Sequence, residues 1–477
     1  MRDILILIII GGSLPFILFM PWIGVLMWYW IGIMNPHRLG WTFITDMPVA
    51  MMVGVVTLAA LVITRDRKPL PFTREIVVLL IFTGYITVTT YFAWSHMAWV
   101  QWDTVMKILL MTFVTPMLIY GRTRTLLLIL VVAGSIAFYG FKGGLFSILT
   151  GGAHMVLGPQ RSFIAGNTDL GLAMIMVLPM LLIIARMFRE NWVDLGILSR
   201  SPKIAGYAAY SVFWLTAAAI IFTYSRGALL GLLAIAPFMF LKMRRKGSLI
   251  LAAVLAVTVI GVTLPERLVS RWQTIQTYEE DHSAMQRVQA WGVNWNMAVE
   301  RPLLGAGFNN VYIPNSVWMS YANFEGPWHP NTARVAHSLY FQVIGHHGFG
   351  GFAVFMTMIL FTLLTLNRIR RQSRHIPGKE WMGQFAWAMQ VGLFGYLVAG
   401  AFLDRAYFDL MFAMVAITII LRRELDTVEA PAPQQVGTEN PGHESSSPAP
   451  RDFVRTPENV QASHAATTDR PMSRQAP

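Results

Sequence analysis

Residues 166–187 have the sequence GNTDLGLAMIMVLPMLLIIARM, in which Asn167, Thr168 and Asp169 precede a long apolar run. A continuous apolar run of about 17–25 residues is long enough to cross a bilayer as a helix. A membrane-embedded backbone must satisfy its own hydrogen bonds, so only helices or a closed barrel are possible. Because the run does not alternate between apolar and polar residues, it predicts a transmembrane helix.

Similar runs occur along most of the chain. Of its 477 residues 55% are hydrophobic and only 13% are charged, against about 25% charged in typical soluble proteins. The sequence therefore predicts an all-α, polytopic membrane helical bundle. After the N-terminal region the apolar runs cover residues 47–63, 74–93, 104–120, 124–140, 166–187, 204–223, 226–241, 247–264, 337–366, 382–402 and 405–421.

The connections between these runs alternate in basic charge, which predicts their orientation. One alternating set contains nineteen Lys and Arg residues, and the short connections of the other set contain only five. Cytoplasmic connections are enriched in basic residues, so the first set is assigned to the cytoplasm. Residues 1–34 then form a retained anchor with a net single crossing, and Pro15 and Pro21 predict a kinked or partly re-entrant first helix. The prediction is about twelve transmembrane helices with both termini cytoplasmic.

Two connections on the outer, periplasmic side are long. One covers residues 141–165. The other covers 265–336, is rich in Trp, Tyr, Asn and Pro, and predicts a folded periplasmic cap. The final segment, 426–477, is rich in Pro, Ser, Gln and Glu and predicts a disordered cytoplasmic tail after a membrane domain of residues 1–425.

The charge and the cysteine content exclude several kinds of function. The net charge of +12 is explained by basic cytoplasmic loops, so it does not indicate a nucleic-acid partner. The chain has no cysteine, which excludes disulfides, thiolate catalysis and cysteine-ligated zinc. The only acidic cluster that could hold a metal is Glu279-Glu280-Asp281-His282, and a solvated acidic run is the better interpretation. No metal and no cofactor are predicted.

Three polar motifs stand at the outer ends of spans and form the candidate site. Arg161 lies in Gly158–Phe163 (GPQRSF), Arg226 in the turn Tyr224-Ser225-Arg226-Gly227, and His337 in Ala336–Tyr340 (AHSLY). Each has a simpler interpretation, because arginines at helix ends often anchor a helix at the headgroups and interface histidines are often only hydrogen-bonded. Weaker candidates for binding pyrophosphate or acceptor are Lys142, Gln160, Tyr224, Ser338 and Tyr340.

Together the three residues fit one reaction class. Guanidinium groups bind phosphate oxygens in bidentate fashion and stabilise a departing pyrophosphate. A neutral histidine accepts the proton of an attacking hydroxyl, and a helix N-terminus favours the neutral form. His346 and His347 are expected to be structural unless the helix breaks near Gly345 and Gly348. At the last outer turn, Asp404 and Arg405 are expected to pair with each other or with headgroups.

These motifs resemble the bacterial O-antigen ligase/polymerase superfamily. The similarity lies in the outer arginine, the Tyr-Ser-Arg-Gly-Ala turn, the Pro-Leu-x-Gly-x-Gly segment 302–307 and the Ala-His-Ser-x-Tyr helix start. The chain also resembles the exosortase A-associated O-glycosylation ligase subgroup at residues 34–38, 142–146, 274–281 and 336–349. The resemblance covers roughly residues 1–422.

The resemblance implies an inner-membrane glycosyltransferase that takes a glycan from undecaprenyl pyrophosphate on the periplasmic side. The acceptor implied is lipid A-core, with metal-independent transfer and inversion at the anomeric carbon. Arg161 and Arg226 would contact the pyrophosphate, and His337 would be the base. A polysaccharide polymerase or a protein O-glycosylation ligase using the same donor remains an alternative. A transporter of lipid-linked glycans is a further alternative, although its polar sites would be expected near the bilayer midplane.

Overall fold

The structure, a computed structural model, describes residues 1–192, 196, 200–243, 247, 282–322 and 332–429. Within these residues every regular element is a helix and no strand occurs, so the predicted all-α class is confirmed. The predicted span 247–264 and the acidic residues 279–281 lie outside the described residues. The elements are α1 (Arg2–Phe19), α2 (Pro21–Tyr29), η1 (Trp30–Met34), η2 (Pro36–Leu39), η3 (Phe43–Asp46), α3 (Val49–Ile63), α4 (Arg74–Tyr91), α5 (Ala98–Leu118), α6 (Gly121–Leu149), α7 (Asn167–Arg189), α8 (Pro202–Phe222), α9 (Arg226–Lys242), α12 (His282–Glu300), η5 (Asn310–Tyr312), α13 (Asn315–Ser320), α14 (Leu339–Gln372), η6 (Ser373–His375), α15 (Glu380–Gly400) and α16 (Asp409–Glu429).

Six of the described helices are long and apolar enough to cross a membrane, as expected for a polytopic membrane protein. They are α1, α4, α6, α7, α8 and the helix formed by α14 with η6. The other predicted spans within the described residues are helical too. α3 and α9 are shorter, with 15 and 17 residues. α5, α15 and α16 have 21 residues each but fall short of the same apolarity. The predicted number of crossings stays a prediction.

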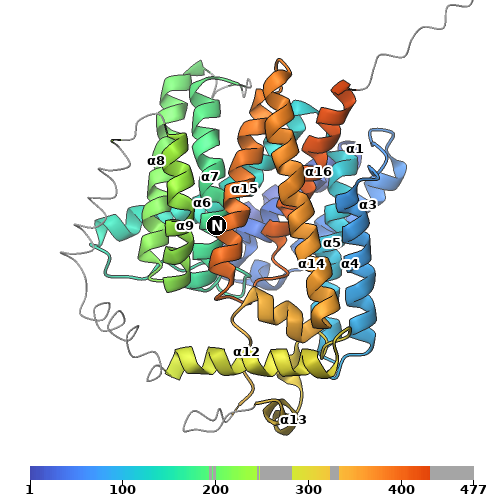
Figure 1. Cartoon of the computed structure of the whole chain (residues 1–477). Coiled ribbons are helices and arrows are strands. Elements are labelled where there is room, and N and C mark those ends of the chain that lie inside the picture. The colour runs from blue at the N-terminus through green and yellow to red at the C-terminus, as the bar shows by residue number, and fades with distance from the viewer. Residues whose placement is uncertain (193–195, 197–199, 244–246, 248–281, 323–331, 430–477) are drawn as a thin grey trace, which may run out of the picture. The chain divides into compact units, whose positions relative to one another are not determined.

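The centre of the bundle is α7, the helix of the opening sequence. Within its most apolar window 94% of the residues are buried. A helix that is apolar on all faces is stable where neighbours surround it, and α7 packs against α6, α8, α9 and α15 (Figure 1). Its polar first turn, with Asn167 and Asp169, therefore lies at the end of the most deeply buried helix.

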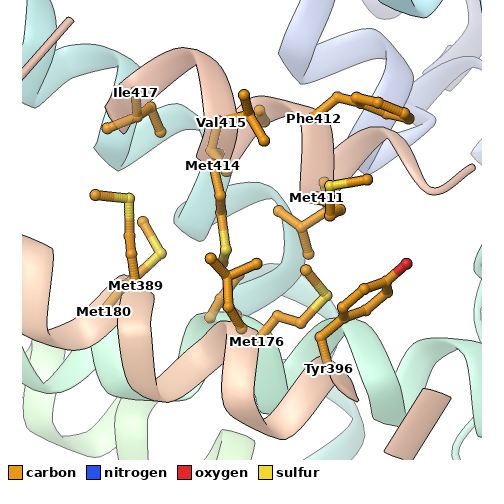
Figure 2. Close-up of a cluster of buried hydrophobic side chains, with 14 of the residues drawn as sticks. Met176, Met180, Met389, Tyr396, Met411, Phe412, Met414, Val415 and Ile417 are labelled. Carbon is orange, nitrogen blue, oxygen red and sulfur yellow. The ribbon is translucent and has the colours of Figure 1, made fainter. Parts of the chain in front are cut away.

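Methionines fill much of the contact between α7, α15 and α16 (Figure 2). Their unbranched side chains adapt to irregular gaps between helices that branched residues would leave empty. All of the labelled residues in this cluster are buried. The cluster contains Met176 and Met180 from α7, Met389 and Tyr396 from α15, and Met411, Phe412 and Met414 from α16.

The N-terminal region forms a helical hairpin, and its predicted net single crossing stays a prediction. α1 ends at a bend around Met20, and α2 begins with Pro21, a residue favoured in the first turn of a helix. The Asp3 carboxylate accepts hydrogen bonds from the backbone N–H groups of Trp41 and Thr42, at 3.1 and 2.9 Å. The start of α1 therefore lies beside the segment that follows the hairpin.

As a consequence, the start of α1 and the end of α16 lie at opposite ends of the bundle. Arg422 near the end of α16 forms an ion pair with Glu75 at the start of α4, at 2.9 Å. α3 separates that end from the contacts of Asp3, and its 15 residues span about 22 Å. The N-terminal hairpin returns the chain to the end of the bundle where α1 begins, and the cytoplasmic location of both termini stays a prediction.

α14 is interrupted at Gly348, where φ is 67° and ψ is −174°. This region of backbone conformation is almost restricted to glycine. The segment 302–307 supplies hydrogen-bond partners to the backbone groups around the interruption, and so holds the first part of α14 in place. The bonds run from Ala306 N–H to the Gly345 carbonyl and from Gly307 N–H to the His346 carbonyl, both at 2.9 Å, and from Gly350 N–H to the Pro302 carbonyl at 3.2 Å.

The described part of the predicted periplasmic cap contains α12, η5 and α13. Ala290, Val293 and Met297 of α12 form a small buried cluster with Trp318 of α13. The indole N–H of Trp291 donates to the Ala336 carbonyl at 2.7 Å, next to the start of α14. Figure 1 shows α12 lying across the end of the bundle. The cap thus holds the segment that leads into α14.

We predict that Gly348→Ala lowers the melting temperature of the purified protein in detergent by several degrees. The strained conformation costs about 1–3 kcal/mol for a residue with a Cβ, and the Cβ would collide with the Pro302 carbonyl. The matched control is Gly134→Ala inside α6, where a Cβ meets nothing within 4 Å. Equal melting temperatures of the Gly348 variant and the wild type would show that the interruption does not need glycine.

Candidate functional site

His337 stands just before α14, in a backbone conformation that residues with a side chain rarely adopt. Its φ is 47°. Asp404 holds it there, because one carboxylate oxygen accepts the His337 backbone N–H at 2.8 Å and lies 3.7 Å from the imidazole Nδ1. The imidazole side chain is 48% exposed, so its ring can be reached by another molecule.

Asp404 lies in the turn between α15 and α16, and that turn is fixed by its neighbours. The Tyr396 hydroxyl, at the edge of the methionine cluster in Figure 2, donates to the Arg405 carbonyl at 2.8 Å. The side-chain carbonyl of Gln342 accepts the Ala406 N–H at 3.0 Å. Burial raises the pKa of Asp404 to about 6, although backbone hydrogen bonds and the nearby Arg405 act in the opposite direction. The carboxylate is therefore ionised at neutral pH and titrates in mild acid.

Several charged side chains surround the His337 imidazole. Burial is the main cause that lowers the pKa of His337, and the positive charges of Arg287, Arg334 and Arg405 lower it further. The negative charge of Asp169 raises the pKa of His337. Asp169 also forms an ion pair with Arg405 at 2.9 Å. At neutral pH the imidazole is uncharged and able to accept a proton.

The fold explains how these charges converge. Arg287 is one helical turn before Trp291 on α12, and the Trp291 bond to the Ala336 carbonyl fixes this helix beside the start of α14. Asp169 lies in the first turn of α7, where the helix dipole favours a carboxylate. The site is therefore assembled from helix ends, not from the middle of any helix.

Arg226 begins α9 and approaches the same turn of the bundle. The next residue, Gly227, lies beside this turn, because a Cβ on it would be in van der Waals contact with Phe402 at 3.5 Å, shortly before Asp404. The Asn167 side chain donates to the Thr223 carbonyl at 2.8 Å and ties the start of α7 to the turn that carries Arg226. The elements of His337 and Arg226 thus meet at the turn between α15 and α16.

Arg161 lies in the loop between α6 and α7 and faces a groove of about 480 Å³. Its guanidinium Nη1 is 3.0 Å from a carboxylate oxygen of Asp46, and Arg38 Nη1 is 3.7 Å from the same oxygen. Among the described contacts Arg161 is joined to Asp46 and His337 to Asp404, so the two residues belong to separate groups. The groove is further lined by Trp41, Thr42, Phe43, Thr45 and Gln160.

The three candidate motifs share one backbone feature, which in the motif of Arg226 belongs to the neighbouring residue Tyr224. Arg161, Tyr224 and His337 have φ values of 58°, 53° and 47°, in the left-handed region. Such conformations cost free energy and gather at functional sites, where the surrounding structure maintains them. This shared strain distinguishes the three motifs from ordinary helix ends that carry an anchoring arginine.

Residues 211–356 match the sequence model of a family described as O-antigen ligase. The chain carries an O-antigen ligase domain. This match supports the resemblance of its motifs to the O-antigen ligase-like superfamily, while the exosortase A-associated subgroup stays a prediction. Residues 1–188 match a family of unknown function, DUF5935. No curated protein matches the chain.

The residues of the candidate site fall into different matched regions of the chain. The O-antigen ligase domain contains Arg226, Arg287, Arg334 and His337. The region of unknown function contains Arg38, Asp46, Arg161 and Asp169. Asp404 and Arg405 lie beyond both matched regions. The arrangement around His337 therefore depends on contacts between the O-antigen ligase domain and the rest of the chain.

The weaker candidates have different surroundings. The hydroxyls of Tyr224 and Tyr340 donate to the carbonyls of Gly152 and Leu397, at 2.5 and 2.8 Å, so they connect elements of the fold. Gln160 is exposed in the groove of Arg161. Ser338 is buried at the start of α14, next to His337.

Lys142 requires a correction of the predicted outer connection. That connection was expected to begin at residue 141, but α6 continues to Leu149. Gly143 and Gly144 allow the extension, because they pack tightly against Val156 and the backbone of Leu215. Lys142 is consequently an exposed residue on a helix and not part of the loop that carries Arg161.

His346 and His347 are buried beside the interruption of α14. The helix does break at Gly348, but their side chains face other partners than His337. Nδ1 of His347 is 2.6 Å from the Thr89 hydroxyl, and Nδ1 of His346 is 3.2 Å from the Tyr407 hydroxyl. These contacts join α14 to α4 and to the turn before α16, which is a structural role.

Sequence reasoning missed the charges closest to His337. Asp404 and Arg405 are expected to pair with each other or with headgroups. The Arg405 guanidinium does donate to the Asp404 carbonyl, but the two charged side chains contact His337 and Asp169. Arg287 and Arg334 do not belong to any of the polar motifs that the sequence predicts to form the site. The available signal was their shared position in outer connections, where basic residues are scarce. In the part of the chain that the structure describes, no cluster of three His, Asp or Glu side chains suits a metal ion.

We predict that Arg287→Gln raises the pKa of His337 toward its usual range. Removing a nearby positive charge makes the protonated imidazole less unfavourable. The measurement is an NMR titration of histidine-labelled protein, with the His337 signal assigned by its loss in His337→Gln. The control is Arg161→Gln, since Arg161 contacts Asp46 and is not among the charges that act on His337. A shift of equal size in both variants would refute the arrangement described.

Proposed function

We propose that this chain is a ligase-type glycosyltransferase. It transfers a glycan from undecaprenyl pyrophosphate to lipid A-core oligosaccharide on the periplasmic face of the inner membrane. The O-antigen ligase domain supports a role in surface glycan assembly. The distribution of basic residues supports the orientation, with the end of α16 in the cytoplasm and the start of α1 on the side of the site.

The observation that carries the proposal is an accessible, neutral His337 held by a buried Asp404. The imidazole accepts the proton of an acceptor hydroxyl while that oxygen attacks the anomeric carbon of the donor glycan. The bond between this carbon and the pyrophosphate oxygen breaks on the opposite face. The pyrophosphate leaves with the electron pair, and the anomeric configuration is inverted.

Arginines supply the positive charge that the leaving group needs. Arg226 approaches the turn that holds His337, and Arg287, Arg334 and Arg405 act electrostatically on the imidazole. Guanidinium groups stabilise the negative charge that develops on phosphate oxygens without changing protonation. Arg161, in its own groove, is assigned to the same lipid-linked pyrophosphate.

A polymerase or a protein O-glycosylation ligase would use the same donor and the same base. The family description favours the ligase, and the acceptor is therefore the decisive variable. A transporter of lipid-linked glycans would form no new glycosidic bond, so any transfer in detergent solution excludes transport as the sole activity.

The experiment mixes purified protein with undecaprenyl-pyrophosphate glycan and, separately, with lipid A-core, lipid-linked glycan or an acceptor protein. We expect one new glycosidic bond on lipid A-core. His337→Ala should reduce the rate by roughly 10²–10⁴-fold, because the general base is lost. The control is His375→Ala, an exposed histidine at the far end of α14 and η6.

Other products would change the assignment. A ladder of lengthening lipid-linked chains would identify a polymerase, and a glycosylated protein would identify the third alternative. If His337→Ala retained the wild-type rate in every assay, His337 would not be the base.

The rate of transfer should fall as the pH decreases through about 6. The Asp404 carboxylate has a pKa of about 6 and loses its charge in this range, and His337, whose pKa burial lowers, gains its proton as the pH falls further, so the base is lost. In Asp404→Asn only His337 titrates, so the acidic side of the profile should become less steep. Initial rates between pH 5 and 8 measure this, and identical profiles would contradict the assigned pair.

A further inference from the structure

The groove beside Arg161 has two guanidinium groups directed at one carboxylate oxygen. Arg38 belongs to η2, Asp46 ends η3, and Arg161 comes from the loop before α7. Nη1 of Arg161 and Nη1 of Arg38 lie 3.0 and 3.7 Å from the same oxygen of Asp46. Two arginines from distant segments that share one anionic oxygen are arranged as they would be around a phosphate.

The Asp46 contact is easily replaced. The side chains of Arg161 and Asp46 are 71% and 72% exposed, and ion pairs between exposed groups contribute little to stability. A phosphate group carries more negative charge than one carboxylate and accepts bonds from both guanidinium groups. A phosphate ligand therefore competes successfully for the two arginines.

The Arg38 side chain and the backbone of the Arg161 loop have hydrogen bonds that do not involve Asp46. Arg38 Nη1 donates to the Thr45 carbonyl at 2.6 Å. The loop of Arg161 is closed by its own hydrogen bonds, from Gly158 N–H to the Ala165 carbonyl at 3.2 Å and from the Ser162 hydroxyl to the Pro159 carbonyl at 2.7 Å. Removal of the carboxylate should leave Arg38 and the loop that carries Arg161 in place, and it frees the Arg161 guanidinium for another anion.

The other wall of the groove suits a lipid. Trp41 and Phe43 line it, and 78% and 52% of their surfaces are exposed. Exposed aromatic residues of membrane proteins are enriched at the level of the headgroups, where a prenyl chain meets its phosphates. Cations on one side and aromatic surface on the other match an amphiphile with an anionic head.

We propose that this groove binds the pyrophosphate of a polyprenyl-linked glycan, and that Asp46 occupies the phosphate position until the lipid displaces it. The inference rests on the proposed function for the identity of the lipid. It adds Arg38 as a second pyrophosphate-binding residue and gives Asp46 the role of an internal competitor. The region of unknown function thereby contributes a binding site for the donor.

The test measures binding of undecaprenyl pyrophosphate to the full chain in nanodiscs. Asp46→Ala should tighten the dissociation constant roughly two- to fivefold, the size expected for losing an exposed ion pair. Arg38→Ala and Arg161→Ala should each weaken binding roughly tenfold or more. In a chain that already carries Arg161→Ala, adding Asp46→Ala should tighten binding less than it does in the wild type. The reason is that Asp46 competes with the lipid partly through its ion pair with Arg161.

The matched control is Asp103→Ala, which removes another exposed carboxylate, paired with Lys107 at 2.5 Å on α5. It should leave binding unchanged. Unchanged affinity in Asp46→Ala and in Arg38→Ala would overturn the proposal. Equal tightening toward phosphatidylglycerol, measured in a parallel titration, would overturn it in favour of a general headgroup site.

The two proposals fail in different ways. Wild-type transfer activity with no effect of Asp46→Ala on binding or on the donor KM would refute the internal competitor alone. Binding that responds to Asp46 and Arg38 in a protein that transfers no glycan would refute the proposed function and leave the pyrophosphate site standing.

Discussion

The interruption of α14 at Gly348, and the backbone hydrogen bonds that segment 302–307 makes to it, determine the position of His337. An uninterrupted helix would leave no free carbonyls for Ala306 and Gly307 to bind. Because these bonds fix the first part of α14, they fix its starting point too. The cap helix α12 also helps to fix this starting point, since the Trp291 indole donates a hydrogen bond to Ala336, the residue immediately before His337.

The site forms where helices end, which has a physical reason. Backbone groups at helix ends lack partners within the helix, so turns and polar side chains gather there to bind them. Asp404 illustrates this, because its carboxylate satisfies the His337 N–H and at the same time faces the imidazole. A residue that completes the backbone hydrogen bonding of a turn thus also sets the electrostatic surroundings of the proposed base.

Much of the helical fold follows from the sequence, because apolar runs longer than a bilayer is thick leave few alternatives. The N-terminal hairpin was missed, since the apolar stretch before residue 34 is nearly continuous and the return is fixed by Asp3 and Thr42 far apart in the sequence. His337, Arg226 and Arg161 could be chosen from their place at span ends. The partners of Arg161 and His337 could not be predicted from the sequence, because only the packing of the bundle brings Asp46 and Asp404 to them.

The methionine cluster between α7, α15 and α16 has a chemical consequence. The chain has 28 methionines and no cysteine, so thioethers are its only readily oxidised sulfur groups. A sulfoxide at Met176 or Met414 would put a polar S=O group among fully buried, mostly apolar side chains, which is unfavourable. The turn with Asp404 connects α15 and α16. Oxidation of methionines between these helices would therefore change their packing and displace Asp404 from His337.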